Sequence, residues 1–138
     1  MRRFVALLAV VLLAACTNEI DQSTRPSAVV GTYQLRSYGG RSLPAVVSSD
    51  AGGVTEVMSG ELVIGSDNSW SETRTYRFSE SGSSQTMSFV YSGSWTFVPK
   101  DAYMLFNLPA LQVQFTGTAA GGSVTLSMSD GNTVIYSH

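Results

Sequence analysis

From residue 30 onward, apolar and polar residues alternate with a period of two, in short runs separated by turn-forming residues. This period places successive side chains on opposite faces of a β-strand, and no long stretch repeats apolar residues at the helical spacing of three or four. The chain is therefore predicted to be all-β. The apolar positions of successive runs are Tyr33 and Leu35; Leu62 and Ile64; Trp70, Tyr76 and Phe78; Met87, Phe89 and Tyr91; Trp95 and Phe97; Leu111, Val113 and Phe115; Val124, Leu126 and Met128; and Val134 and Tyr136.

Turn signals separate these runs at intervals that are typical of short antiparallel strands. Short connections favour an up-and-down meander of about eight to ten strands, and closing the meander removes both unpaired sheet edges. We therefore expect residues 30–138 to form a small antiparallel β-barrel, with a two-sheet sandwich as the second interpretation. The clearest turn signals lie at residues 65–68, 79–84, 99–101, 121–122 and 130–131.

The N-terminal residues have a different pattern. Arg2 and Arg3 precede an unbroken run of ten apolar residues at positions 4–13. As a helix, such a run would be about 15 Å long, against about 30 Å for the hydrocarbon core of a bilayer. Residues 1–15 are therefore predicted to be a secretory signal peptide. The polar segment 16–29 is predicted to be a flexible tether that leads to the barrel domain.

The motif Leu13-Ala14-Ala15-Cys16 follows the apolar run and resembles the bacterial lipobox. That resemblance implies cleavage before Cys16 and attachment of acyl chains to this residue. Since each buried methylene contributes about 0.8 kcal/mol and two chains already give stable anchoring, the protein is expected to stay at the membrane. Thr17 stands where Asp is the usual inner-membrane retention signal, so the resemblance favours the outer membrane, facing the periplasm or the cell surface.

Two segments resemble lipocalin-like bacterial lipoproteins: residues 31–44, which begin Gly-Thr-Tyr-Gln-Leu, and residues 60–78, which carry the pattern Trp-x-Glu-x-x-x-Tyr. In lipocalins the first strand begins Gly-x-Trp, and the Trp closes one end of the barrel. Here Tyr33 stands in its place, and the late Arg that packs over the Trp has no clear counterpart in residues 113–129. The resemblance implies a small lipocalin-like barrel.

Composition excludes several classes of function. The formal net charge is −2 and Lys100 is the single lysine, so the basic surface of a nucleic-acid-binding protein is missing. One His and one Cys cannot form a Cys/His zinc site, which needs about four ligands. The single His, His138, is the last residue, where a catalytic triad is not expected. We predict no catalytic residues, no metal, no cofactor and no enzymatic activity.

One run carries charges on its apolar side. Alternation places Glu72 and Arg74 on the same face as Trp70 and Tyr76. If this face lines the interior, the two charges need each other or a polar group of a ligand. These four residues are therefore the candidate ligand-binding site. A structural ion pair, or a bulge that turns this part of the strand outward, would give the same pattern without a ligand.

Two classes of function remain open. The first is a membrane-anchored envelope lipoprotein that binds a small apolar or amphipathic molecule inside the barrel. The second is a barrel with a filled core that acts through its outer surface, for example as an inhibitor of an envelope enzyme. A barrel of about eight strands is just wide enough for either arrangement. The sequence names neither the ligand nor a protein partner.

Overall fold

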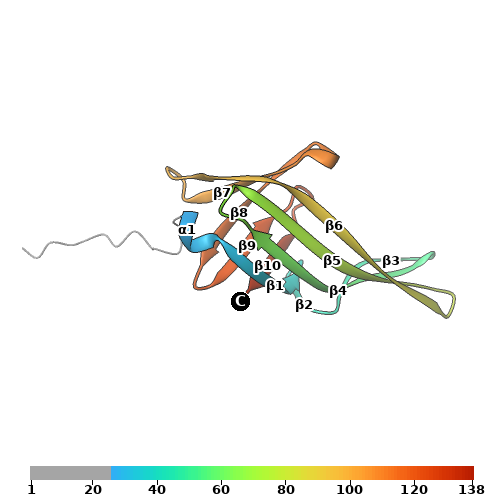
Figure 1. The fold of residues 1–138 in the computed structure, drawn as a ribbon. Coiled ribbons are helices and arrows are strands. Elements are labelled where there is room, and N and C mark those ends of the chain that lie inside the picture. Colours follow the sequence, from blue (N-terminus) through green and yellow to red (C-terminus); the bar gives the residue numbers. More distant parts are fainter. Residues whose placement is uncertain (1–25) are drawn as a thin grey trace, which may run out of the picture.

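The computed structural model describes residues 26–138, so the predicted signal peptide, Cys16 and most of the predicted tether lie outside the described residues. The described chain is dominated by antiparallel strands that follow one another along the sequence (Figure 1). Its elements are α1 (Pro26–Val29), β1 (Gly31–Tyr38), β2 (Arg41–Ser42), β3 (Ala45–Asp50), β4 (Gly53–Ile64), β5 (Ser69–Glu80), β6 (Ser83–Val98), β7 (Tyr103–Leu108), the 3-10 helix η2 (Pro109–Leu111), β8 (Val113–Ala120), β9 (Ser123–Ser127) and β10 (Thr133–Ser137).

Eight of the strands close into an up-and-down barrel, which confirms the predicted fold. Strands β4 to β10 pair in sequence order, and β1 closes the ring. Residues 31–34 of β1 pair with β4, and residues 34–38 pair with β10. Two strands lie outside the ring, because β2 pairs only with the end of β1 and β3 only with the first half of β4.

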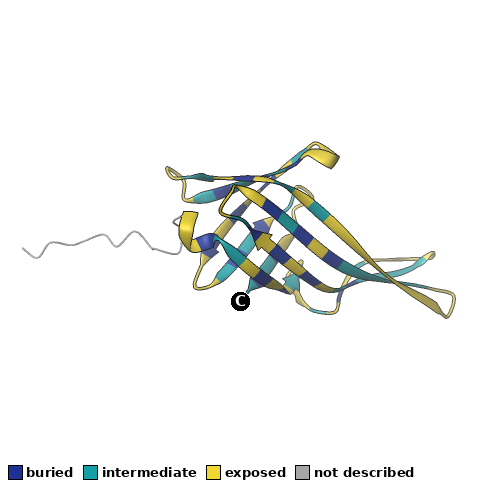
Figure 2. Cartoon of the chain, viewed as in Figure 1, coloured by how far each residue is buried: buried dark blue, intermediate teal, exposed yellow. Residues whose placement is uncertain are grey.

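The core lies inside the ring and is built from alternate positions of its strands, as the alternation of buried and exposed residues along them shows (Figure 2). Trp70 and Trp95 are 2% and 3% exposed, which confirms that both point inward. The Trp70 ring packs edge-on against Phe106 and Phe115, with centroid separations of 5.7 and 5.3 Å. A Cβ at Gly93 would lie 1.8 Å from the Asn107 carbonyl oxygen, so the absence of a side chain there keeps that carbonyl open to the Trp70 indole N–H, 3.1 Å away.

One end of the barrel is closed by α1 and the start of β1. The last four residues of the segment predicted as a tether form α1, and Val29 at its end is 1% exposed. The Tyr33 hydroxyl donates a hydrogen bond of 2.9 Å to the Val29 carbonyl oxygen, and the His138 ring lies 4.2 Å from the Tyr33 ring between centroids. Tyr33, which replaces the Trp of the lipocalin pattern, is thus buried at this end.

At the other end, two hairpins continue beyond the ring. Strand β6 is 16 residues long but pairs with β7 only over residues 94–98, while residues 83–93 pair with β5 alone among the described strands. We call the projecting sheet the extension: β3, residues 53–57 of β4, residues 76–80 of β5 and residues 83–90 of β6 (Figure 1). It forms a four-stranded sheet with no opposite wall.

The turn between β7 and β8 differs from the sequence expectation. The alternation grouped Leu111 with Val113 and Phe115 in one strand, but β8 begins only at Val113. Pro109, whose fixed φ and missing N–H suit the first turn of a helix, begins η2, and Gln112 turns the chain with a φ of 54°. Leu111 is consequently 61% exposed at the rim of the barrel.

Candidate functional site

A cavity of about 200 Å³ opens at the end of the barrel away from α1. Its walls come from the inner faces of β5, β6, β7 and β8 and from the two turns that follow β7 and β9. Most of the side chains are apolar, and the charged ones belong to β5. The lining residues are Trp70, Glu72, Arg74, Tyr91, Leu108, Leu111, Val113, Phe115, Met128 and Ser129.

The two charged residues reach the interior because β5 keeps its register. The pairing of β5 with β6 is continuous from Ser69 to Glu80, so no bulge changes the alternation. Glu72 and Arg74 are 2% and 4% exposed, which confirms that both lie on the inner face. On the neighbouring strand β4, Gly60 lies opposite Arg74, and the absence of a side chain there makes room for Leu35, which a Cβ would approach to 3.1 Å.

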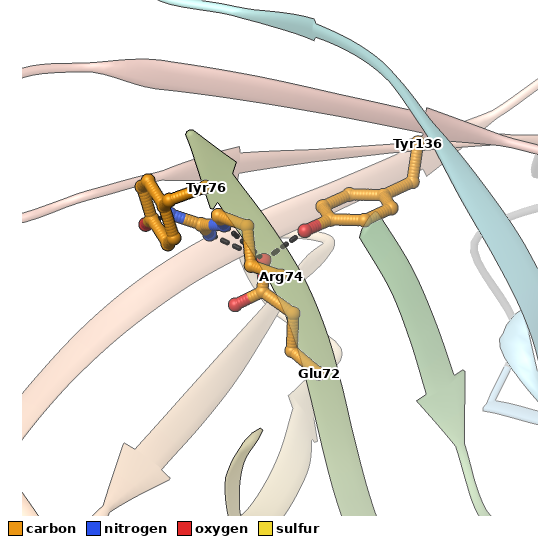
Figure 3. Close-up of polar contacts among 4 residues, drawn as sticks. All are labelled: Glu72, Arg74, Tyr76 and Tyr136. Atoms are coloured by element: carbon orange, nitrogen blue, oxygen red, sulfur yellow. Dashed lines mark hydrogen bonds and ion pairs between the residues drawn. The ribbon is translucent and has the colours of Figure 1, made fainter. Parts of the chain in front are cut away.

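The two side chains form a buried ion pair (Figure 3). Arg74 Nε donates a hydrogen bond of 2.8 Å to Glu72 Oε1, and Arg74 Nη2 donates to the same oxygen. The Tyr136 hydroxyl, which comes from the last strand of the barrel, also donates to Glu72 Oε1. Arg74 Nη1 donates to the Tyr76 hydroxyl at 3.2 Å, and the guanidinium carbon lies 5.2 Å from the centre of the Tyr38 ring.

Burial and the opposite charge together set the protonation of this cluster. Burial works against the charge on Arg74, but the attraction and hydrogen bond of Glu72 together with the oxygens of Tyr136 and Tyr76 outweigh it and raise the pKa of the guanidinium. Burial raises the pKa of Tyr136, and the negative charge of Glu72 raises it further. Arg74 is therefore charged, and the Tyr136 hydroxyl keeps its proton and remains a donor, throughout the neutral pH range.

The second oxygen of Glu72 is in a different situation. All three hydrogen bonds to this carboxylate end on Oε1, so within residues 26–138 no donor reaches Oε2. Every polar side-chain atom of the described residues that is fully buried has a hydrogen-bond partner, so an atom without a partner, such as Oε2, must be accessible. Oε2 is therefore open to the cavity that Glu72 lines. It offers an acceptor with a negative charge to a molecule in this cavity.

The structure brings the four candidate residues together. Trp70, Glu72 and Arg74 line the cavity, and Tyr76 contacts Arg74 just beyond it. Sequence reasoning missed Tyr136, which lies 64 positions from Glu72. Its place on the inner face of the last strand was readable from the alternation, but the barrel closure that carries it to β5 was not. Cys16, the predicted lipidation site, lies outside the described residues.

A larger hollow of about 730 Å³ lies between the tips of the two hairpins of the extension, and it is open and mostly lined by polar residues such as Ser48, Asp50 and Glu80. Within residues 26–138, no group of three or more His, Cys, Asp or Glu side chains is placed to hold a metal ion. No helix in that part of the chain is long and apolar enough to cross a membrane.

Comparisons with protein-family models, with curated protein sequences and with solved structures find no match to this chain. The closed barrel is consistent with the lipocalin-like resemblance of the sequence.

Proposed function

We propose that the protein binds a small apolar or amphipathic molecule in the barrel cavity, with a hydrogen-bond donor of the molecule facing Glu72. The observation that carries this proposal is the free oxygen Oε2 of Glu72, open to a cavity whose other walls are mostly apolar. Ligand sites typically combine apolar walls with a few placed polar groups that orient the ligand. A hydroxyl, amide or ammonium group would satisfy Oε2, whereas a carboxylate would be repelled by it.

The volume limits the size of the ligand. A cavity of about 200 Å³ is smaller than the roughly 300–1,000 Å³ of sites for drug-sized molecules. Since a water molecule takes up about 30 Å³ in the liquid, the cavity has the volume of about six or seven waters. The enclosed group is therefore a short molecule, or one end of a longer amphiphile whose remainder leaves through the mouth beside Leu111.

The proposal also places the barrel at a membrane. The resemblance of residues 13–16 to the lipobox implies acyl chains on Cys16, and by the same resemblance Thr17 favours the outer membrane. Removal of residues 1–15 would take two of the eight basic residues and leave six against ten acidic ones, a net charge of −4. Anionic lipids do not attract such a surface, so the acyl chains hold the protein at the bilayer.

Cys16→Ser should abolish metabolic labelling with palmitate, and labelling that persists would contradict the anchor.

Binding can be tested by isothermal titration of the full-length protein with hexylamine, hexanol and hexanoate, which share one chain and differ in the head group. We expect hexylamine and hexanol to bind more tightly than hexanoate. Val113→Trp should lower the affinity at least about tenfold, because the larger ring fills the mouth of the cavity. Gln114→Trp is the matched control, since Gln114 is exposed on the outer face of the same strand.

Wild type that binds none of the three compounds would overturn the proposal, and so would equal binding by Val113→Trp and wild type.

The other class of function, an interaction lipoprotein that acts through its outer surface, is favoured by a different feature: the unpaired edge of β6.

A further inference from the structure

Strand β6 has a long unpaired edge. Over residues 83–93 it pairs with β5 on one side, and within the described part of the chain no strand pairs with its other side. Residues 81–90 are all exposed. A row of free backbone N–H and C=O groups of this length is a template for a further β-strand.

The edge lacks the devices that usually protect an edge strand. Lysine, proline, a bulge or an inward charge commonly prevent pairing between molecules. Residues 81–98 contain no charged residue and no proline, and the pairing of β6 with β5 has no bulge. Its solvent-facing side chains include Met87, Phe89 and Val90, which are 43%, 38% and 69% exposed. This edge is therefore open to pairing.

The other edge of the extension, β3, is protected by comparison. It has six residues, its register against β4 shifts between Val46 and Ser48, and it ends on Asp50. The Arg41 side chain also donates a hydrogen bond of 3.4 Å to the Val46 carbonyl oxygen on this strand. A short, bulged and charged edge is a poor template, so only β6 is suited to receive a strand.

We propose that the β6 edge pairs with β6 of a second copy of this chain in an antiparallel, two-fold symmetric dimer. Charge favours this partner, because an edge without charges meets its own copy without repulsion. The nearest charges on the outer face are already neutralised: Arg77 Nε and Nη2 lie 2.8 and 2.6 Å from Glu56 Oε2. An isologous contact also closes on itself, so it consumes the edge and stops at two copies.

The alternation along β6 restricts the register. Residues that lie opposite each other in an antiparallel pair point to the same face, so Met87 cannot lie opposite Ser88 or Val90 of the second copy, whose side chains point to the other face. A dyad at Ser88 instead places Met87 opposite Phe89 of the second copy, and the reverse. The apolar face of the extension would then continue across the dimer, with Tyr76 and Phe78 flanking it on β5.

The size of the contact predicts a weak dimer. Eleven paired residues at about 3.4 Å each give a seam about 37 Å long, and a sheet is about 10 Å thick. Each copy would bury on the order of 350 Å², or about 700 Å² in total, less than the roughly 1,200–2,000 Å² of stable complexes. We therefore expect dissociation at low concentration, and stronger pairing where both copies share one membrane surface.

Sedimentation of the full-length chain in detergent micelles, over a wide range of concentration, tests the dimer. Wild type should change from one to two chains per particle as concentration rises. Ser88→Lys should raise the dissociation constant at least about tenfold, because the dyad brings the two lysines together. Thr116→Lys is the matched control, since Thr116 is exposed on β8 between two paired strands and adds the same charge.

A second measurement fixes the register in the membrane. Single cysteines placed at Ser84, Thr86, Ser88, Val90 and Ser92 should form disulfides between copies most readily at the residue on the dyad, where opposed Cα atoms are about 4.5–5.5 Å apart. Thr116→Cys should form disulfides between copies no more than the chain without an added cysteine does. Wild type that stays monomeric, particles that grow beyond two copies, or equal effects of Ser88→Lys and Thr116→Lys would overturn the proposal.

Discussion

The barrel and the extension are formed by the same strands, yet burial differs greatly between them. On β6, Trp95 in the ring is 3% exposed, while Phe89 in the extension is 38% exposed. Both residues occupy inner-face positions of one continuous alternation. The difference arises because β7 and the opposite wall of the ring cover Trp95, whereas nothing in the described chain closes over Phe89. Alternation thus assigns a face, and tertiary closure decides whether that face becomes a core.

The largest expected contrast comes from truncating one aromatic residue in each region. Trp95→Ala should lower the free energy of unfolding by roughly 3–5 kcal/mol, because it leaves a cavity in the core and removes the donor of the 3.0 Å bond to the Gly65 carbonyl oxygen. Phe89→Ala should cost less than about 1 kcal/mol. Urea unfolding of both variants gives the values. Similar losses in the two variants would mean that the extension is part of the cooperative core.

The ion pairs of the two regions provide the next contrast. Glu72→Leu should cost roughly 3 kcal/mol or more, because Arg74 then remains buried without its partner. Glu56→Leu removes a more exposed partner of Arg77 in the extension and should cost at most about 1 kcal/mol.

The loss of stability in Glu72→Leu could come from the unpaired charge of Arg74 or from lost packing, and the double variant Glu72→Leu/Arg74→Met distinguishes the two causes. If the unpaired charge is the cause, removing both charges should recover most of the stability. Thermal and urea unfolding of the three variants measure this. If the double variant were less stable than Glu72→Leu, the unpaired guanidinium would not be the cause.

Much of this organisation was predictable from local pattern, and its limits have a physical explanation. The strands, the buried indoles and the inward charges follow from a period of two, which depends only on neighbouring residues. The contact of Tyr136 with Glu72 depends on which strand closes the ring, and local pattern does not encode that. Similarly, β6 alternates without interruption from Met87 to Phe97, so nothing in the pattern marks the point where β7 stops pairing with it.

Alkaline pH should destabilise the barrel through its tyrosines. Burial raises the pKa of Tyr33, Tyr38, Tyr91 and Tyr136 above the ordinary value of 10.0, and Glu72 adds to the effect at Tyr136. A raised pKa leaves stability complete below about pH 10 and reduces it above that pH, where the unfolded chain loses protons that the folded chain keeps. Each such tyrosine contributes a slope of at most about 1.4 kcal/mol per pH unit.

Tyr136→Phe should flatten this decline, which urea unfolding at a series of pH values from neutral to alkaline would measure. A stability that is unchanged above pH 10 in wild type would contradict the burial of these phenols.

The smallest effects are expected at two hairpin turns of the same type, one in each region. Gly121 and Gly122 connect β8 to β9 with φ values of 56° and 77°, and Ser81 and Gly82 connect β5 to β6 with φ values of 47° and 84°. Two central residues with positive φ define a turn that strongly favours Asn-Gly, and Ser81 is the unfavourable residue among the four.

Ser81→Asn should therefore stabilise the hairpin by a few tenths of a kcal/mol, whereas Gly121→Ala should destabilise the barrel by about 1 kcal/mol. Because the extension has no opposite wall, it is expected to open locally, and hydrogen exchange should record Ser81→Asn as slower exchange in residues 78–86, with little change in global unfolding. Gly121→Ala should instead appear in global unfolding, since β8 and β9 cannot separate without opening the ring.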